Sequence, residues 1–184
     1  MSKPITKGDE YIDSRDVMNR IEEFENDREA LADTLQEALE TLEEAQRTFD
    51  TAKEELVSAG RHDTLAQREA VEEAQEAFEQ AQSAYDDAKA ELEEWDESEE
   101  AEELKDLVEL NDMCENESDW SYGAQLIHDS VFEDYAKQFA EDLGLLENCN
   151  KWPATCIDWT QAADELKQDY TTIEWGDETY YLRA

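Results

Sequence analysis

The sequence contains few basic residues. Of its 184 residues, 15 are Lys or Arg and 53 are Asp or Glu, which gives a formal net charge of −38. DNA, RNA and anionic lipid surfaces bind proteins through cationic faces. The composition therefore excludes direct binding to nucleic acids or anionic membranes, and it favours a basic protein as the partner.

Residues that carry redox, metal and nucleophilic chemistry are also scarce. The three cysteines, Cys114, Cys149 and Cys156, form no CxxC motif and cannot all pair, which is unlike a secreted disulfide framework. With only His62 and His128, neither a zinc site nor a histidine-based triad is expected. We predict no enzymatic activity, no cofactor and no metal site.

Long apolar segments are missing as well. No run of 18 apolar residues occurs, and the first ten residues lack the apolar stretch of a signal peptide. We therefore expect a soluble cytoplasmic protein.

Two long segments carry a heptad pattern. Apolar residues recur at alternating spacings of four and three over residues 17–56 and again over 71–95, with no proline inside either segment. Sustained 3.5-residue repeats are typical of coiled coils. Gly60 ends the first segment, and Asp63 with Thr64 and Gln67 can cap the second. The pattern predicts two helices joined near residues 60–63.

Pairing the two helices around this turn brings large residues opposite small ones, for example Phe49 opposite Ala74. Arg28, which interrupts the apolar seam, falls opposite Trp95, where a cation–π contact would accommodate it. Because short connections are common, we predict an antiparallel hairpin within one chain. Whether the hairpin also forms a homodimer stays open.

After residue 100 the heptads stop. A helix is expected through Ile127, Val131, Tyr135 and Phe139, ending at Gly144. Residues 159–168 read as a second helix with Asp158 as its cap, and residues 170–175 and 178–183 as a β-hairpin.

The predicted fold class is thus mainly α, with a long antiparallel coiled-coil hairpin followed by a small α+β domain that ends in a β-hairpin. Three parts are expected: a flexible N-terminal lead-in (1–16), the acidic helical hairpin (17–98) and the small α+β domain (99–184).

The carboxylates of the hairpin follow the heptads. Residues 17–98 hold 26 acidic and 7 basic side chains. At 1.5 Å per residue the hairpin is about 65 Å long, so its net charge is about one per 3.4 Å, against one per 1.7 Å for duplex DNA. The following carboxylates face away from the seam and are predicted to bind the partner: Glu22, Glu23, Glu29, Asp33, Glu37, Glu40, Glu43, Glu44, Asp50, Glu54, Glu72, Glu73, Glu76, Glu79, Asp86, Asp87, Glu93 and Glu94.

The same carboxylates are compatible with two simpler roles. The outward positions of any coiled coil are polar, so the charges can simply solvate the hairpin, and a protein adapted to high salt is acidic too. Ordinary hairpins, however, mix Lys with Glu to gain i,i+4 pairs.

The C-terminal third has a recognisable set of residues. It comprises Asp134-Tyr135-Ala136, Glu141-Asp142-Leu143-Gly144, Trp152-Pro153, Ile157-Asp158-Trp159, Ala162-Ala163, Leu166, Asp169-Tyr170, Gly176 and Tyr180-Tyr181-Leu182-Arg183. Over about residues 128–183 the chain thereby resembles the terminal module of ArdA-type antirestriction proteins. The resemblance implies an acidic mimic of DNA, although the modules that usually precede this one are replaced by the hairpin.

The resulting hypothesis is a DNA-mimic inhibitor, encoded by a phage or mobile element and located in the cytoplasm of a bacterial host. Its partner would be a basic DNA-binding defence complex, with a restriction-modification enzyme preferred over a CRISPR effector. Two alternatives remain: a structural coiled-coil spacer with a C-terminal protein-binding module, and an acidic sequestrant of basic nucleoid proteins.

Overall fold

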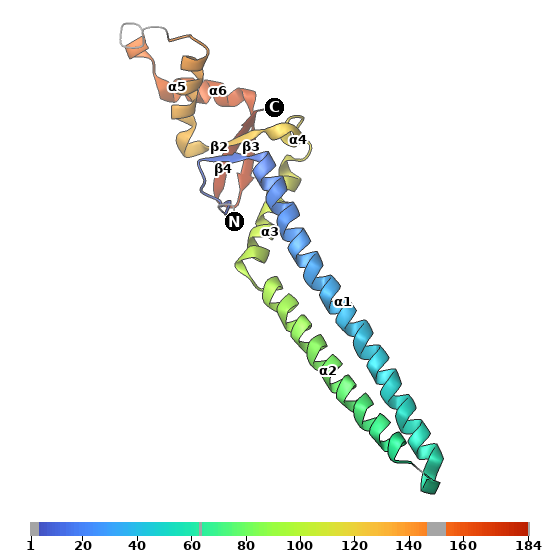
Figure 1. Ribbon diagram of the computed structural model, residues 1–184. Coiled ribbons are helices and arrows are strands. Elements are labelled where there is room, and N and C mark those ends of the chain that lie inside the picture. Colours follow the sequence, from blue (N-terminus) through green and yellow to red (C-terminus); the bar gives the residue numbers. More distant parts are fainter. Residues whose placement is uncertain (1–3, 63, 147–153, 184) are drawn as a thin grey trace. The chain divides into compact units, whose positions relative to one another are not determined.

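The computed structural model describes residues 4–62, 64–146 and 154–183 (Figure 1). It confirms the predicted fold class: a mainly helical chain with a long helical hairpin and a small α+β domain that ends in a β-hairpin. The elements in chain order are β1 (Tyr11–Asp13), α1 (Ser14–Ala59), η1 (Gly60–His62), α2 (Leu65–Asp96), α3 (Glu99–Cys114), α4 (Trp120–Gly123), β2 (Gln125–His128), η2 (Asp129–Val131), α5 (Phe132–Asp142), η3 (Ala154–Cys156), α6 (Trp159–Leu166), η4 (Lys167–Asp169), β3 (Tyr170–Trp175) and β4 (Glu178–Arg183).

The chain divides into two compact units. The hairpin unit comprises residues 24–101, and the α+β unit comprises residues 1–23 together with 102–184. This differs from the three predicted parts, because the first residues do not form a separate lead-in. They join the C-terminal residues in one unit, and α1 contributes residues to both units.

The hairpin forms as the heptads predict. Helices α1 and α2 run side by side in opposite directions (Figure 1). Gly60 ends α1 with a φ of 57°, a left-handed conformation that glycine adopts without strain. Thr64 and Gln67 form a complete capping box at the start of α2. Both signals are therefore confirmed.

The hairpin core consists of aromatic and small residues. Ala74, Ala81 and Ala88 are each only 7% exposed, as expected where small residues receive large ones. The rings of Phe49 and Phe78 stack with their centroids 6.0 Å apart, a contact that the predicted Phe49–Ala74 layer did not include.

Arg28 finds a different partner from the predicted one. Its guanidinium forms an ion pair with the Asp96 carboxylate at 2.8 Å. The predicted partner Trp95 is adjacent in sequence, and a carboxylate attracts a cation more strongly than an indole ring does at an exposed position.

The α+β unit is built on a four-stranded antiparallel sheet with the order β1-β2-β4-β3. Strand β1 pairs with β2 and so forms one edge of the sheet. The predicted flexible lead-in is wrong for these residues: Ile12 is 3% exposed and Ser14 is fully buried. The Ser14 hydroxyl donates a hydrogen bond of 2.7 Å to the Trp120 carbonyl, which fixes the start of α1.

Helices cover both faces of this sheet. On one face, the Trp175 indole N–H donates a hydrogen bond to the carbonyl of Asp106 in α3. On the other face, the ring of Tyr181 meets that of Phe132 in α5 with centroids 4.8 Å apart. Figure 1 shows α5 and α6 on the same side of the strands.

The predicted helix through residues 127–139 is partly wrong. Ile127 lies in strand β2, where it pairs with Tyr181, and the helix α5 begins only at Phe132. Ile127 and Tyr135 nevertheless pack in the same hydrophobic cluster, from a strand and a helix respectively. Their spacing therefore reflects a shared core and not a shared helix. The predicted stop at Gly144 is confirmed by its φ of 70° just after α5.

Two further predictions in the C-terminal third are confirmed. The Asp158 carboxylate accepts a hydrogen bond from the Gln161 backbone N–H and caps α6. The β-hairpin occupies Tyr170–Trp175 and Glu178–Arg183 as expected. The sequence also singled out Asp63, Cys149, Trp152 and Pro153, which lie outside the described residues.

Candidate functional site

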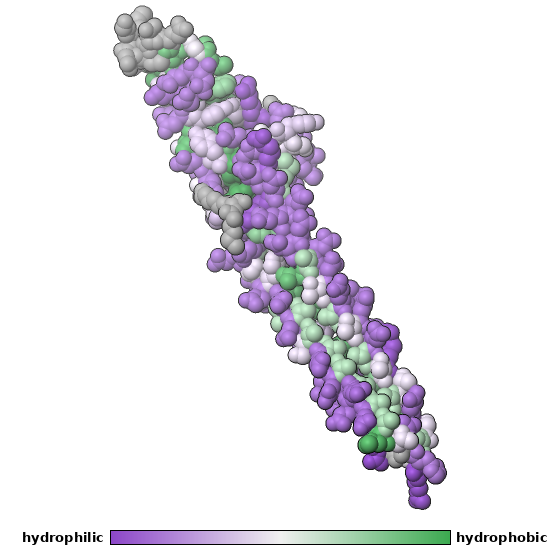
Figure 2. Space-filling view, viewed as in Figure 1, coloured by the Kyte–Doolittle hydropathy of each residue, from purple (hydrophilic) through white to green (hydrophobic). Residues whose placement is uncertain are grey.

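All eighteen carboxylates that the sequence selected have exposed side chains. Sixteen of them belong to the hairpin unit, while Glu22 and Glu23 belong to the α+β unit. Figure 2 shows the outer surfaces of α1 and α2 as mostly hydrophilic, with a paler stripe where the helices meet.

Neutral side chains donate hydrogen bonds to several of these carboxylates. Glutamine amides donate hydrogen bonds four residues along the helix, from Gln36 to Glu40 at 2.9 Å and from Gln75 to Glu79 at 2.8 Å. A neutral donor orients a carboxylate without cancelling its charge. The hairpin unit thus keeps 26 acidic against 6 basic side chains, and repulsion along both helices is largely uncompensated.

Salt is expected to stabilise the hairpin for this reason. Raising NaCl from about 0.1 to 1 M shortens the screening length from about 10 to about 3 Å. We expect the melting temperature, followed by circular dichroism at 222 nm, to rise by about 5–10 °C because the repulsion is screened. Salt also weakens the exposed ion pairs, but these contribute little to stability. A variant with Glu37, Glu44 and Glu76 replaced by glutamine should gain less from salt. An unchanged melting temperature would show that repulsion is unimportant.

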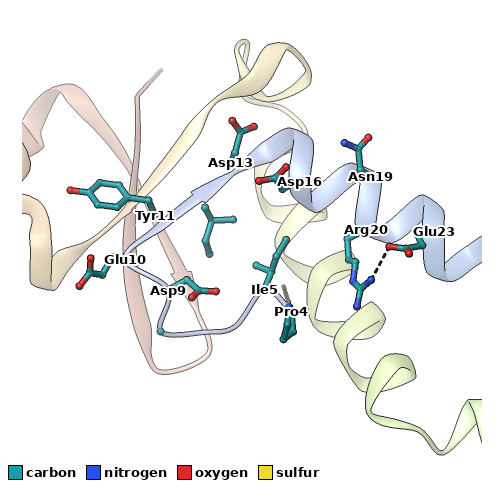
Figure 3. A pocket seen from close by; sticks show the side chains of 12 residues that line it. Pro4, Ile5, Asp9, Glu10, Tyr11, Asp13, Asp16, Asn19, Arg20 and Glu23 are labelled. Carbon is teal, nitrogen blue, oxygen red and sulfur yellow. Dashed lines mark hydrogen bonds and ion pairs between the residues drawn. The ribbon is translucent and has the colours of Figure 1, made fainter. Parts of the chain in front are cut away.

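A distinct cavity lies in the α+β unit, along strand β1 (Figure 3). Its volume is about 610 Å³, within the usual range of binding pockets. We call it the β1 groove. Its lining residues are Pro4, Ile5, Gly8, Asp9, Glu10, Tyr11, Ile12, Asp13, Asp16, Asn19, Arg20 and Glu23.

The β1 groove follows the free edge of the sheet. The backbone of Glu10 accepts a hydrogen bond from His128 N–H at 3.0 Å, and Ser14 N–H donates one to Ala124 at 2.9 Å. Backbone groups alternate in direction along an antiparallel strand. Residues 10, 12 and 14 therefore bond to residues 124–128, and Tyr11 turns its N–H and C=O to the side on which no strand of the described residues pairs with β1.

The groove is strongly acidic. Of the twelve described residues that line it, five are Asp or Glu and one, Arg20, is cationic. Glu10 and Asp16 are exposed and form no ion pair within the described part of the chain. Figure 3 shows Asp16, Asn19, Arg20 and Glu23 on the stretch of α1 that borders the groove.

Arg20 is committed to structural contacts. Its guanidinium pairs with Glu23 at 2.8 Å and with Glu103 of α3 at 3.3 Å. Burial acts to lower the pKa of Arg20, but these two hydrogen bonds outweigh it and raise the pKa above its usual value. Arg20 is therefore already neutralised by carboxylates of the α+β unit itself.

Asp13 is likewise held by a neighbour. The Arg15 side chain donates hydrogen bonds to its carboxylate, at 2.7 and 3.1 Å, and they lower the pKa of Asp13. Asp13 stays charged in the native state. Asp9 accepts a hydrogen bond from the Thr6 backbone N–H at 2.9 Å, and Glu23 pairs with Arg20, so Glu10 and Asp16 remain as the carboxylates that can pair with a ligand.

Sequence reasoning missed this groove because Pro4 and Gly8 suggested a loose lead-in. The one sequence signal for a strand here is the segment Tyr11-Ile12-Asp13, in which Ile12 lies on one face of a strand and its two neighbours on the opposite face. A three-residue strand is too short to be distinguished from coil by such a pattern. The groove contains only Glu23 of the carboxylates that the sequence selected.

Within the described residues, no group of three or more His, Cys, Asp or Glu side chains could hold a metal ion. Nor does any described helix combine the length and the apolar content needed to cross a membrane.

A comparison with protein families identifies a relationship that the sequence reasoning did not. Residues 6–104, more than half of the chain, match the family described as mitochondrial outer membrane protein OM45. The chain belongs to the OM45 family. Comparisons with curated proteins and with solved structures give no match.

OM45 membership overturns the proposed relationship to ArdA-type antirestriction proteins. The residues that carried the resemblance include Gly176, Leu166 and Tyr180, which serve a turn and the core of the sheet. Any small domain built in this way needs such residues. The resemblance reflected a similar core requirement and not a shared family.

The functional predictions built on that resemblance are wrong as well. A member of the OM45 family is not expected to be a phage-encoded DNA mimic, to bind a bacterial restriction or CRISPR complex, or to work in bacterial cytoplasm. The two alternatives, a coiled-coil spacer and a sequestrant of nucleoid proteins, gain no support from the family match. The prediction that the protein has no membrane partner conflicts with the family's description. Charge density alone does not identify DNA mimicry, because outward carboxylates also solvate ordinary helices.

Proposed function

We propose that this OM45-family protein acts at the mitochondrial outer membrane by binding an extended, basic segment of a protein partner in the β1 groove. The family's description supports the location. The observation that carries the binding role is the free edge of β1 beside a cavity with five carboxylates.

Backbone pairing gives the proposed interaction its geometry. An extended peptide adds to an exposed sheet edge through main-chain hydrogen bonds, and pockets for alternate side chains give specificity. Tyr11 presents its N–H and C=O to such a peptide, while Ile5 and Ile12 supply the apolar part of the lining.

Charge determines the chemistry of the peptide. Lys or Arg side chains at alternate positions can pair with Glu10 and Asp16, and the surrounding negative charge speeds encounter with a basic segment. Glu10 and Asp16 are both exposed, so they lack the contrasting environments that a pair of carboxyl groups needs for general acid–base catalysis. The proposed role is therefore binding and not catalysis.

Fluorescence anisotropy with a labelled peptide of alternating Lys and Val tests this proposal. The Glu10→Lys/Asp16→Lys double variant should bind at least about tenfold more weakly, since each close opposite charge contributes about 1 kcal/mol or more near a protein surface. The matched control is Glu37→Lys/Glu40→Lys on the hairpin, which changes the net charge equally and should bind nearly as well as the wild type.

Hydrogen exchange supplies an independent measurement. The Tyr11 amide should exchange more slowly when the peptide is present, because it then donates to the peptide backbone. The proposal is contradicted if both double variants bind the peptide equally weakly and hydrogen exchange of the Tyr11 amide is unchanged. The interaction would then be non-specific electrostatic attraction. Circular dichroism should confirm that all variants are folded.

A further inference from the structure

The end of the hairpin differs from the rest of the unit in charge. We call residues 56–68 the hairpin tip; it contains Arg61, His62 and Arg68 but a single acidic residue, Asp63. The whole hairpin unit holds 26 acidic residues among its 78. A segment of thirteen residues would carry about four carboxylates at that density, so the tip is depleted in negative charge.

The tip also exposes large apolar side chains. Val57 is 79% exposed and Leu65 is 73% exposed, and within the described part of the hairpin unit these are the only exposed large hydrophobic residues. Figure 2 shows strongly hydrophobic atoms at the surface near the end of the hairpin.

Neither apolar residue is needed by the fold. Val57 follows Leu56, the last seam residue of α1, and Leu65 is the first residue of α2. The cap that begins α2 is made by Thr64 and Gln67, and the turn is made by Gly60, whose φ is positive. A polar residue would satisfy the local structure at either apolar position.

We infer that the hairpin tip contacts the headgroup region of a phospholipid bilayer. Val57 and Leu65 would enter between the headgroups, and the exposed Arg61 guanidinium would donate hydrogen bonds to lipid phosphate oxygens. The family match spans the entire hairpin, and the family is described as an outer membrane protein.

The flanking charges select the lipid. Glu54, Glu55, Glu69, Glu72 and Glu73 lie on the helical turns on either side of the tip, and all are exposed. A surface rich in anionic lipid would repel them. The matching surface is therefore zwitterionic, with phosphates that accept hydrogen bonds but no net charge. This inference does not depend on the β1 groove.

Flotation of the full-length protein with phosphatidylcholine vesicles at millimolar lipid tests the inference. The Val57→Ser/Leu65→Ser variant should lose at least about tenfold in vesicle partitioning, because each methylene group withdrawn from water contributes a factor of about four. The matched control is Tyr122→Ser/Leu145→Ser, which removes two exposed apolar side chains from the α+β unit and should partition as the wild type does.

Two more measurements make the result specific. Arg61→Gln should lower partitioning severalfold, and replacing a third of the phosphatidylcholine by phosphatidylserine should lower it further. Equal losses in tip and control variants, or stronger binding to anionic vesicles, would overturn the inference. A lower molecular mass of the tip variant than of the wild type in analytical ultracentrifugation would also overturn it. Such a result would mean that the wild-type tip pairs with a second copy of the chain. Unchanged peptide binding in the tip variant separates this result from that for the groove.

Discussion

Replacing Trp175 by alanine is expected to lower the free energy of unfolding of the α+β unit by about 3–5 kcal/mol. Trp175 is completely buried, and its ring packs beside Tyr180 with centroids 6.3 Å apart. Its indole N–H donates a hydrogen bond of 3.1 Å to the Asp106 carbonyl. Alanine leaves a cavity between the sheet and α3 and removes this hydrogen bond.

Urea unfolding followed by near-ultraviolet circular dichroism would measure this loss. Trp175→Phe serves as a second variant, because it keeps most of the volume and loses the hydrogen bond, which contributes about 1 kcal/mol. Tyr122→Ala removes an aromatic ring that is 84% exposed and should change stability by less than about 0.5 kcal/mol. A loss below about 1 kcal/mol for Trp175→Ala would mean that this face of the sheet is not the core.

Cys114 and Cys156 should differ by about a thousandfold in their reaction with iodoacetamide at pH 8. Cys114 is fully buried, whereas Cys156 is exposed. Burial, with a smaller contribution from Glu117, raises the pKa of the Cys114 thiol to about 12. Compared with a thiol at the ordinary pKa of 9.0, its reactive thiolate is about a thousand times rarer.

Peptide mapping by mass spectrometry after timed labelling would measure both rates. In urea the two cysteines should react alike, because the unfolded chain removes the burial that raises the pKa of Cys114. The raised pKa also predicts that alkaline pH destabilises the α+β unit. The stability from keeping this thiol neutral is complete below pH 9 and is lost as the pH approaches 12. Rapid native labelling of Cys114 would show that α3 opens readily.

The local features of the chain could be predicted from its sequence. The heptads place Ala74 and Ala81 in the seam, and Gly60 and Thr64 mark the turn. Asp158 caps α6, and the residues around Gly176 form the β-hairpin. Each of these depends on neighbours within a few residues or on an uninterrupted repeat. Such signals do not require knowledge of distant parts of the chain.

The β1 groove could not be predicted in this way. Strand β1 has three residues, and it is a strand only because residues 125–127 lie beside it, more than a hundred positions later. The same distance explains why Ile127 was assigned to a helix. The carboxylates that the sequence selected were numerous and equivalent, so charge alone pointed to the hairpin and to the wrong class of partner.

Signals within the sequence thus specify the acidic coiled-coil hairpin, its turn and the C-terminal β-hairpin, because heptad spacing, caps and turn residues act over short distances along the chain. The free backbone edge of Tyr11, and the position of Glu10 and Asp16 beside one cavity, follow from the folded arrangement alone. Those properties arise because residues 11–13 pair with residues 125–127, far along the chain. Burial of residues such as Ile12 and Leu126 stabilises this strand pairing. Contacts between such distant residues leave no periodic pattern in the sequence.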